Sequence, residues 1–420
     1  MPLSDLMAHP AQPSIGTGAV DKIVHAIRHH LGMDVAFVAE FRESDRIFRH
    51  VDALDRTPVH RGDAVPLDVG YCQRVVDGRL PGLIPDTQRV PAAMALAETQ
   101  AIPIGAHLSV PIRLSDGRVF GTLCSFSFTA DPSLGERDLK IMQVFATLLA
   151  DQIERDTLGQ RAQAEKSSRI TAALAARQPS IVYQPVYDLA TSRLAGLESL
   201  SRFQMEPQRT PDKWFAEAAE VGMSVELELA AIRTALHALH SMPPDAYLSV
   251  NCSPKTILRG ELQNLLRGID VKRLVLEITE HDYIEDYPGL LAALAPLRAF
   301  GLRTAIDDAG AGYASLRHVL HIQPELIKLD ISLTRHIDRD LKRRALASAL
   351  IAFARETQAH IVAEGVETEA ELRTLKLLGA GCAQGYFLAR PLPLAEAIHQ
   401  PFPVTSSVVS ANTARISAAE

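Results

Sequence analysis

Cysteine is scarce in this sequence of 420 residues, and the few that occur are far apart. No two of them form a CxxC pair; they are Cys72, Cys124, Cys252 and Cys382. Neither a zinc site built on cysteine pairs nor a disulfide framework is therefore indicated. Unpaired thiols suit a reducing cytoplasm, where we expect the protein to work.

Long apolar runs and an excess of positive charge are also missing. No apolar stretch reaches the roughly 18 residues that a membrane-spanning helix needs. The N-terminus has neither the basic nor the apolar segment of a secretion signal, so we expect no export and no membrane insertion. The formal net charge of −7 gives no electrostatic reason to expect duplex nucleic acid as a partner. A phosphate ligand would need local positive charge or a metal.

The length of the chain is sufficient for two domains. A sequence of 420 residues is too long for one ordinary core, and 47% hydrophobic with 22% charged residues is typical of a globular protein. Its patterns suggest a first domain, a helical connector, a second domain and a disordered tail, at residues 16–155, 156–168, 169–401 and 402–420.

The first domain is predicted to hold two hairpins and helices outside them. Apolar spacing predicts a helix over 18–31, and runs at 33–41 and 46–51 predict the first hairpin. The second hairpin turns at Asp116-Gly117, a strong turn signal between alternating runs. Without βαβ alternation, the pattern indicates an α+β domain whose antiparallel sheet is covered on one face. The segment LSVPIRLSDGRVFGTLCSFS and the helix after it resemble GAF sensor domains, which implies a fold and leaves the GAF ligand unknown.

An amphipathic helix is predicted to follow the second hairpin. Over 133–155 its apolar stripe is formed by Leu139, Met142, Phe145, Leu149 and Ile153. Beyond Ile153 the stripe fades into charged residues. Two interpretations stay open, a charged connector or a parallel signalling helix in a homodimer, and we favour the second because a sensor needs a stiff link to its output domain.

The second domain alternates short β-branched runs with helical stretches, the pattern of a (β/α)8 barrel. Its eight predicted strands lie at 181–189, 194–202, 247–253, 274–280, 303–308, 326–332, 360–367 and 381–389. Only residues 190–193 separate the first strand from the second. A parallel crossover needs a dozen or more residues, so the first strand is expected to run antiparallel to the second.

Two adjacent carboxylates, Asp307 and Asp308, close the fifth strand. Neighbouring side chains of a regular strand point to opposite faces, so both can reach one site only if the strand ends there, which Gly310 and Gly312 permit. Two carboxylates at one place repel each other unless a cation lies between them, and oxygen ligands favour magnesium or manganese. A helix N-cap beside a solvated aspartate is the alternative.

Polar residues also end the other strands, where the chemistry of such barrels takes place. Each alone has a structural explanation, but together they interrupt apolar runs, where charge is rarely buried unless it is paired or bound to metal. They are Glu198, Asn251, Glu277, Asp307 with Asp308, Lys328, Glu364 and Gln384.

These residues and their order resemble the EAL-domain cyclic-di-GMP phosphodiesterases. The motifs that carry the resemblance are Glu198-Ser199-Leu200-Ser201-Arg202, VNCS, Glu277-Ile278-Thr279-Glu280, the Asp307-Asp308 pair, Lys328-Leu329-Asp330, AEGVE and QGYFLARPLP, between about 169 and 401. The resemblance implies hydrolysis of cyclic-di-GMP to linear pGpG with two Mg²⁺ or Mn²⁺ ions per site.

Roles for individual residues follow from the oxygen chemistry and from this resemblance. The first metal can take oxygen ligands from Glu198, Asn251, Glu277 and Asp307; by resemblance Asp307 bridges to a second metal that Asp308 and Glu364 complete. The resemblance makes Lys328 the catalytic lysine that orients the attacking water, with Glu364 and the loop-stabilising Glu280 in the catalytic set. It assigns substrate contacts to Arg202, Asp330, Glu367 and Gln384.

Departures from the family pattern leave a rival interpretation open. Ala309 and Ala311 replace a phenylalanine and a threonine of the family, so we expect a loosely packed loop. Leu333 likewise stands where phenylalanine is frequent, but no ligand is lost. The rival is a catalytically silent barrel that acts as a cyclic-di-GMP receptor or a protein-interaction module. No GGDEF-like run occurs, which argues against cyclic-di-GMP synthesis.

Overall fold

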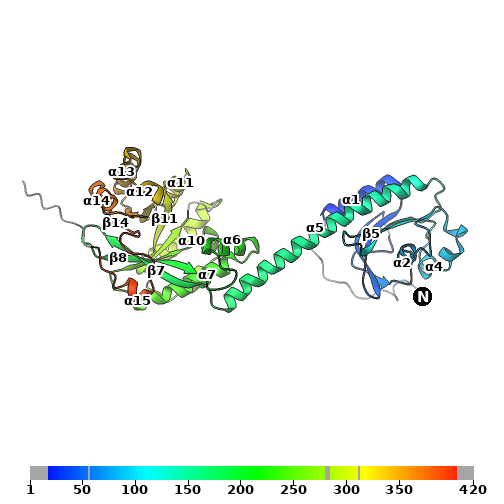
Figure 1. The fold of residues 1–420 in the computed structure, drawn as a ribbon, viewed down its shortest axis with the longest axis horizontal. Helices are drawn as coiled ribbons and strands as arrows, with labels where there is room; N and C mark the ends of the chain where they lie inside the picture. Colours follow the sequence, from blue (N-terminus) through cyan, green and yellow to red (C-terminus); the bar gives the residue numbers. More distant parts are fainter. Residues whose placement is uncertain (1–17, 55–56, 280–283, 311–312, 404–420) are drawn as a thin grey trace, which may run out of the picture. The chain divides into compact units, whose positions relative to one another are not determined.

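The computed structural model describes residues 18–54, 57–279, 284–310 and 313–403. The chain divides into two compact units between Ala164 and Glu165 (Figure 1). Within the described ranges, no helix combines the length and the apolar character needed to cross a membrane. Nearly all of the tail predicted at 402–420 lies outside the described residues.

The first unit is built on a six-stranded antiparallel sheet with the order β3-β2-β1-β6-β5-β4. Both predicted hairpins are confirmed, as β1 with β2 and β5 with β6. The strands are β1 Val35–Phe41, β2 Asp45–Ala53, β3 Ala64–Pro66, β4 Leu83–Ile84, β5 Ala106–Arg113 and β6 Val119–Ser127. The helices are α1 Gly18–Leu31, α2 Tyr71–Val76, α3 Pro91–Met94, α4 Ala97–Ala101 and α5 Glu136–Ala175.

Both faces of this sheet are covered, so the expectation of one covered face is wrong. On one face, α1 and the first part of α5 lie side by side (Figure 1), and Val24, Met142 and Leu149 pack against the strands. On the other, α2, α3 and α4 bury Cys72 and Ile102 against a second core. These three helices have four to six residues each. They are too short to show a helical stripe in the sequence.

Helix α5 runs without a break through the predicted connector. It has 40 residues, so the amphipathic stretch and the charged stretch after it belong to one helix. Its last turns form part of the second unit, where Ile170 and Ala173 pack against Trp214 of α6 Pro211–Glu220. Arg169 adds an ion pair to Glu217 at 2.8 Å. The end of α5 is therefore fixed to the barrel by apolar and ionic contacts.

The second unit is a closed eight-stranded barrel, as predicted. Its strands are β7 Ser180–Asp188, β8 Leu194–Arg202, β9 Tyr247–Asn251, β10 Leu274–Ile278, β11 Arg303–Ala309, β12 Leu326–Leu329, β13 His360–Ala363 and β14 Cys382–Ala383. The reversed first strand is confirmed, because β7 pairs antiparallel with both β8 and β14. The other neighbours pair in parallel.

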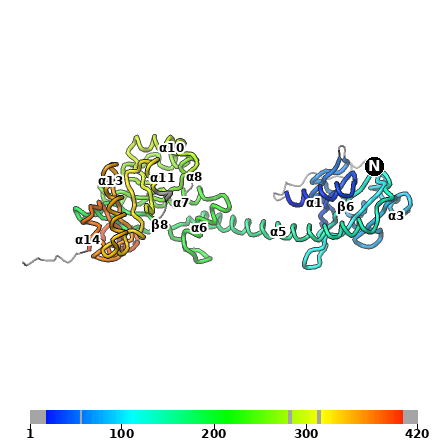
Figure 2. The backbone as a smooth tube through the Cα atoms, turned by 90° about the horizontal axis from the view of Figure 1, so that it is seen from above, coloured from blue at the N-terminus to red at the C-terminus, as the bar shows by residue number. Residues whose placement is uncertain are grey.

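Helices surround the barrel strands (Figure 2). Besides α6 they are α7 Ser224–Leu236, α8 Pro254–Leu258, α9 Glu261–Leu265, α10 Tyr287–Ala299, α11 Tyr313–Ile322, α12 Ile331–Thr334, α13 Leu341–Glu356, α14 Glu369–Leu378 and α15 Leu394–Ala397. A continuous apolar core joins the inner sides of these helices to the strands. The carboxyl ends of the parallel strands are thereby held at one rim.

Candidate active site

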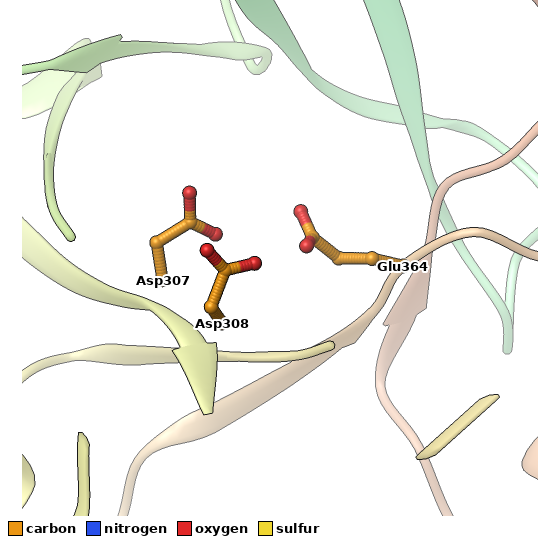
Figure 3. A group of neighbouring side chains, drawn as sticks. All are labelled: Asp307, Asp308 and Glu364. Carbon is orange, nitrogen blue, oxygen red and sulfur yellow. The ribbon is translucent and has the colours of Figure 1, made fainter. Parts of the chain in front are cut away.

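The two aspartates of β11 reach one site through a break in the strand. Asp308 has φ of 54°, and the pairing register with β12 shifts between Ile306 and Ala309. We expected the strand to end at the aspartates, but it continues to Ala309. Aspartate tolerates this left-handed conformation better than most residues. At Asp308 it interrupts the regular alternation of side chains between the two faces of the strand. Both carboxylates consequently face the same side (Figure 3).

Glu364, which follows β13, completes a group of three carboxylates with this pair. Asp307, Asp308 and Glu364 each offer an oxygen atom, and these atoms lie within 4.8 Å of one another (Figure 3). All three side chains are partly buried. Like charges this close repel unless protons or a cation compensate them. The group therefore has the donor atoms and the spacing that a hard divalent cation requires.

Lys328 lies at the centre of the carboxylates and is 3% exposed. Its Nζ atom is 2.7 Å from Glu364 Oε1, 2.9 Å from Asp307 Oδ1, 3.0 Å from Glu277 Oε2 and 3.4 Å from Glu198 Oε1. With Asp308 included, five carboxylates against one ammonium leave a formal excess of four negative charges. Two divalent cations would neutralise that excess, so the residues present fit a two-metal site.

The electrostatics of the cluster lead to the same conclusion. Burial alone would lower the pKa of Lys328, but the surrounding carboxylates raise it well above its usual value. Burial raises the pKa of Glu277 to about 8 and that of Glu364 well above its usual value; the Lys328 ammonium opposes this rise, and neighbouring carboxylates add to it. Without further positive charge, Glu277 and Glu364 retain their protons to a higher pH than usual, and bound cations would displace those protons.

Gln384, which follows β14, holds Glu198 in place, and Gln184 of the reversed strand β7 holds Gln384. The Gln384 side-chain amide donates to Glu198 Oε2 and, at 3.0 Å, to Gln184 Oε1. Gln184 in turn donates to the Ala389 carbonyl at 3.0 Å and pairs with Glu198 across β7 and β8. Gln184 was not predicted from the sequence, because it lies inside β7 and not at a strand end. A polar residue inside an apolar strand was the signal that could have found it.

A cavity of about 450 Å³ lies at the carboxyl ends of β8 and β9, next to α6 and α7. Its lining includes Arg202 and Asn251, two residues selected from the sequence, together with Asp212, Phe215 and Glu228 from α6 and α7. The Arg202 side chain donates to the Ser201 carbonyl at 2.8 Å, which leaves other guanidinium N–H groups for a ligand. Acidic, cationic and apolar groups therefore border the same space.

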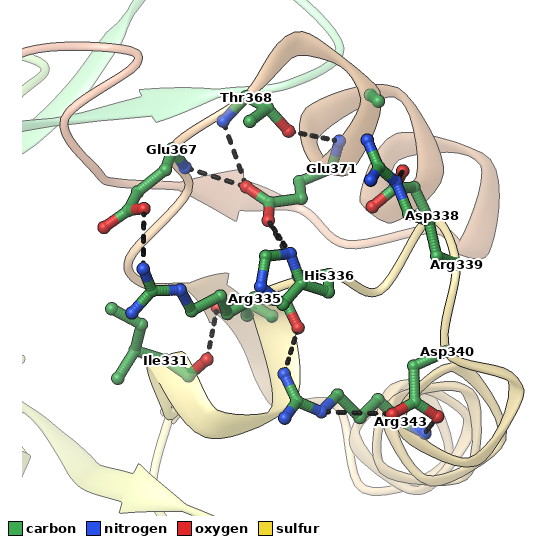
Figure 4. A network of polar contacts seen from close by, with 12 residues as sticks. Ile331, Arg335, His336, Asp338, Arg339, Asp340, Arg343, Glu367, Thr368 and Glu371 are labelled. Carbon is green, nitrogen blue, oxygen red and sulfur yellow. Dashed lines mark hydrogen bonds and ion pairs between the residues drawn. The ribbon is translucent and has the colours of Figure 1, made fainter.

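Two other predicted site residues, Glu367 and Asp330, contact groups outside the cluster, and a third, Glu280, is not described. The Glu367 side chain is 39% exposed and lies 3.5 Å from Arg335 (Figure 4). Asp330 caps α12 by accepting from the Ser332 backbone N–H at 2.8 Å. Glu280 falls within 280–283, outside the described residues.

Glu371 on α14 accepts hydrogen bonds from two loops that follow barrel strands. This residue was not predicted from the sequence. Its buried carboxylate accepts backbone N–H groups of His336 at 2.7 Å, Glu367 at 2.9 Å and Thr368 at 3.0 Å (Figure 4). The Thr334 hydroxyl also donates to the carbonyl of Glu364. These contacts connect the segment after Lys328 with the segment after Glu364. The sequence signal was a capping box from Thr368 to Glu371.

Ala309 and Gly310 are tightly packed, contrary to the expectation of a loose loop. Ala309 is fully buried and pairs with Leu329. Gly310 has φ of 106°, and a Cβ atom there would lie 2.2 Å from Leu333 Cδ1. Ala311 lies outside the described residues.

Replacing Gly310 with valine is therefore expected to damage both the fold and the cluster. Strain at positive φ and overpacking each cost about 1–3 kcal/mol. We expect a fall of several degrees in Tm and at least a tenfold loss of whatever activity the cluster supports. Gly268→Val is the matched control, because Gly268 has φ of 82° with nothing within 4 Å of its Cβ position. Equal Tm and activity in the two variants would contradict the packing argument.

Comparison with known proteins covers both units. The EAL domain model matches residues 167–391, and the GAF domain model matches residues 17–153. Cyclic di-GMP phosphodiesterase NbdA of Pseudomonas aeruginosa is 31% identical over 52% of this chain and 29% of its own length. The bifunctional diguanylate cyclase/cyclic di-GMP phosphodiesterase MucR of the same species is 31% identical over 53% and 34%. An uncharacterized protein of Sinorhizobium fredii, y4lL, is 32% identical over 57% and 30%. The chain thus spans about a third of the length of these relatives.

Solved structures match the barrel and also the two-unit chain. The c-di-GMP complex of PaMucR phosphodiesterase aligns with a TM-score of 0.50 and 29% identity, over 55% of this chain and 99% of that one. The EAL enzyme Bd1971, bound to cAMP and cyclic-di-GMP, aligns with a TM-score of 0.54 over 87% of this chain and 93% of its own, and at 18% identity shares the fold. The barrel and the ordered motifs at its rim make this chain a member of the EAL-domain family, with a GAF domain preceding the EAL domain.

Proposed function

We propose that this protein hydrolyses cyclic-di-GMP to linear pGpG at the rim of its barrel, with two Mg²⁺ or Mn²⁺ ions. The observation that carries the proposal is the group of four carboxylates around a single buried ammonium, with Asp308 as a fifth carboxylate beside two of them. Homology to cyclic-di-GMP phosphodiesterases and the cavity lined by Arg202 and Asn251 support this substrate.

The metal ligands divide into two sets that share one residue. Glu198, Asn251, Glu277 and Asp307 would hold one ion, and Asp308 and Glu364 with Asp307 would hold the other. When bound, such ions lower the pKa of water and stabilise charge on the attacking and leaving oxygens of a phosphodiester. Gln384 fixes the Glu198 carboxylate, so that ligand is oriented before a metal binds.

The remaining residues act on water and substrate. Lys328 would hold and polarise the attacking water through its ammonium, and Glu364 would help to position it. Arg202 can bind a phosphate through two parallel N–H groups. Glu367, Gln384 and Asp330 are proposed to contact substrate, and Glu280 is proposed to stabilise a loop of the site.

Turnover measured by separation of cyclic-di-GMP from pGpG tests the proposal. We expect hydrolysis with Mg²⁺ or Mn²⁺, none with EDTA, and little with Ca²⁺, because Ca²⁺ takes more ligands at longer distances. Native mass spectrometry of the purified protein would count the bound ions. Cyclic-di-GMP binding without turnover under all metal conditions would contradict the proposal and identify a receptor.

The GAF domain is proposed to regulate the barrel through α5 in a cytoplasmic homodimer. The domain limits predicted from the sequence are 16–155 and 169–401. The GAF and EAL domain models match residues 17–153 and 167–391. The proposal rests on apolar side chains that α5 exposes: Val144 is 61%, Leu148 48% and Leu158 64% exposed. A second copy of α5 would bury them.

Placing a charge on this surface of α5 is expected to separate the dimer. Leu148→Glu should lower the molar mass measured by light scattering to that of a monomer, because a buried carboxylate between two helices costs several kcal/mol. Gln143→Glu changes an exposed residue on another side of the same helix and serves as the control. A wild-type protein that is monomeric at all accessible concentrations would contradict the dimer.

A further inference from the structure

The GAF domain buries a cluster of ionisable side chains that takes no part in the proposed hydrolysis. Arg46 of β2 is 1% exposed, and its neighbours include Cys72 of α2 and Cys124 of β6, both fully buried. A guanidinium removed from water to this degree needs anionic or strongly polar partners. The identity of those partners determines what the cluster can do.

Arg46 is shared between a carboxylate and a sulfur atom. Its Nη2 donates to Glu98 Oε1 at 2.6 Å, and its Nη1 donates to Cys72 Sγ at 2.7 Å. The other oxygen of Glu98 accepts the Tyr71 backbone N–H at 3.2 Å. Glu98 is thereby held on one side of the guanidinium, and the sulfur of Cys72 occupies the other side. A thiol in contact with an arginine is favoured as a thiolate.

A second thiol lies against the first. Cys72 Sγ is 3.5 Å from Cys124 Sγ, compared with about 2.05 Å in a disulfide. Two hydroxyl groups also surround Cys124 Sγ, that of Ser109 at 3.0 Å and that of Thr122 at 3.2 Å. The two sulfur atoms would have to approach by about 1.5 Å, and an oxidant would have to accept two electrons, before they could form a disulfide.

The two thiols differ in acidity. Burial would raise the pKa of Cys72, but hydrogen bonding to Cys124 and the charge of Arg46 lower it to about 7, against the opposing effect of Glu98. Burial raises the pKa of Cys124 well above its usual value. One sulfur is thus partly ionised near neutral pH, and its neighbour retains its proton. Cys382 provides a contrast, because burial raises its pKa to about 11.

We propose that Cys72 and Cys124 form an oxidation site at which a hydroperoxide generates an intramolecular disulfide. The Cys72 thiolate attacks the terminal peroxide oxygen, the O–O bond breaks, and the leaving alkoxide or hydroxide takes up a proton. Cys72 becomes a sulfenic acid. The sulfur of Cys124 then attacks Cys72 Sγ, the S–O bond breaks, and the Cys124 proton leaves with the oxygen as water. Two thiols and one hydroperoxide yield one disulfide, one alcohol or water molecule, and one further water molecule.

This inference does not depend on the proposed phosphodiesterase activity. Disulfide formation would link α2 covalently to β6 and would remove the sulfur anion from Arg46. The oxidised GAF domain would therefore differ from the reduced one at a fully buried position.

Oxidation of the full-length protein tests the site. The reduced chain is treated with equimolar hydrogen peroxide, denatured, alkylated with N-ethylmaleimide, and analysed by intact and peptide mass spectrometry. We expect two of the four cysteines to escape alkylation, a Cys72–Cys124 peptide pair, and full alkylation after dithiothreitol. Four alkylated cysteines, or a disulfide that involves Cys252 or Cys382, would overturn the proposal.

Variants separate the roles within the cluster. In Cys124→Ser, oxidised Cys72 should stop at a sulfenic acid that dimedone labels; in Cys72→Ser, Cys124 should stay reduced. Arg46→Gln should slow disulfide formation at pH 7 about tenfold or more, whereas the exposed Arg113→Gln on β5 should not. Circular dichroism checks the fold of each variant. If Arg46→Gln does not fold, the order in which the four cysteines of the wild-type chain are oxidised tests the proposal instead. Oxidation of Cys382 before Cys72 would refute the assignment of Cys72 as the oxidation site.

Discussion

Asp307→Asn is expected to lower kcat for cyclic-di-GMP hydrolysis by about a thousandfold, equivalent to about 4 kcal/mol of transition-state stabilisation. Asp307 belongs to both proposed ligand sets, and its Oδ1 lies 2.9 Å from Lys328 Nζ without a hydrogen bond of good geometry. Asparagine keeps the shape but removes the negative charge. Both ions should bind more weakly, so native mass spectrometry should also detect less metal.

The effect on stability distinguishes a lost ligand from a damaged fold. Removing one of several crowded carboxylates relieves repulsion, so Tm of the metal-free variant should be no lower than that of the metal-free wild type. Glu356→Gln, an exposed carboxylate at the end of α13, is the control for loss of one charge. A correctly folded Asp307→Asn protein with near wild-type turnover would refute the two-metal assignment.

Lys328→Met should reduce kcat by ~10² or more and leave substrate affinity within about tenfold. Methionine keeps much of the volume of this 3% exposed side chain but removes the ammonium that lies among four carboxylates. If the lysine acts mainly on water, the loss appears in kcat. Saturation kinetics at fixed Mg²⁺, together with binding to the Ca²⁺ form, measure the two quantities separately.

Lys342→Met, on the exposed start of α13, controls for the loss of a surface charge. Unchanged kcat with much weaker binding would instead make Lys328 a phosphate anchor. A lower metal content with unchanged kcat per bound metal would instead mean that Lys328 positions the carboxylates that bind metal.

Much of the barrel could be predicted because its signals are local. Loop length alone indicated the reversed β7, since four residues cannot cross a barrel. The polar strand ends could be read because neighbouring parallel strands place their carboxyl ends at one rim, and there Glu198, Glu277, Asp307 and Glu364 meet around Lys328.

What could not be predicted depends on contacts between distant residues. The left-handed conformation of Asp308 keeps β11 continuous through the aspartate pair, and no residue pattern distinguishes this from a strand end. Gln184 gains its role only when Gln384, 200 positions later, lies beside it. The approach of Cys72 to Cys124, 52 positions apart on α2 and β6, likewise arises from packing.

The direction of β7 also determines where the incoming chain meets the barrel. Ser180, the first residue of β7, pairs with Arg202, the last residue of β8, so the strand begins at the rim that carries the carboxylates. Helix α5 precedes this strand by only a few residues and packs on α6, which lines the cavity. A parallel first strand would have brought the helix to the opposite rim, a full strand length from the chemistry. Reversal of one strand therefore places the end of α5 at the rim that carries the carboxylates.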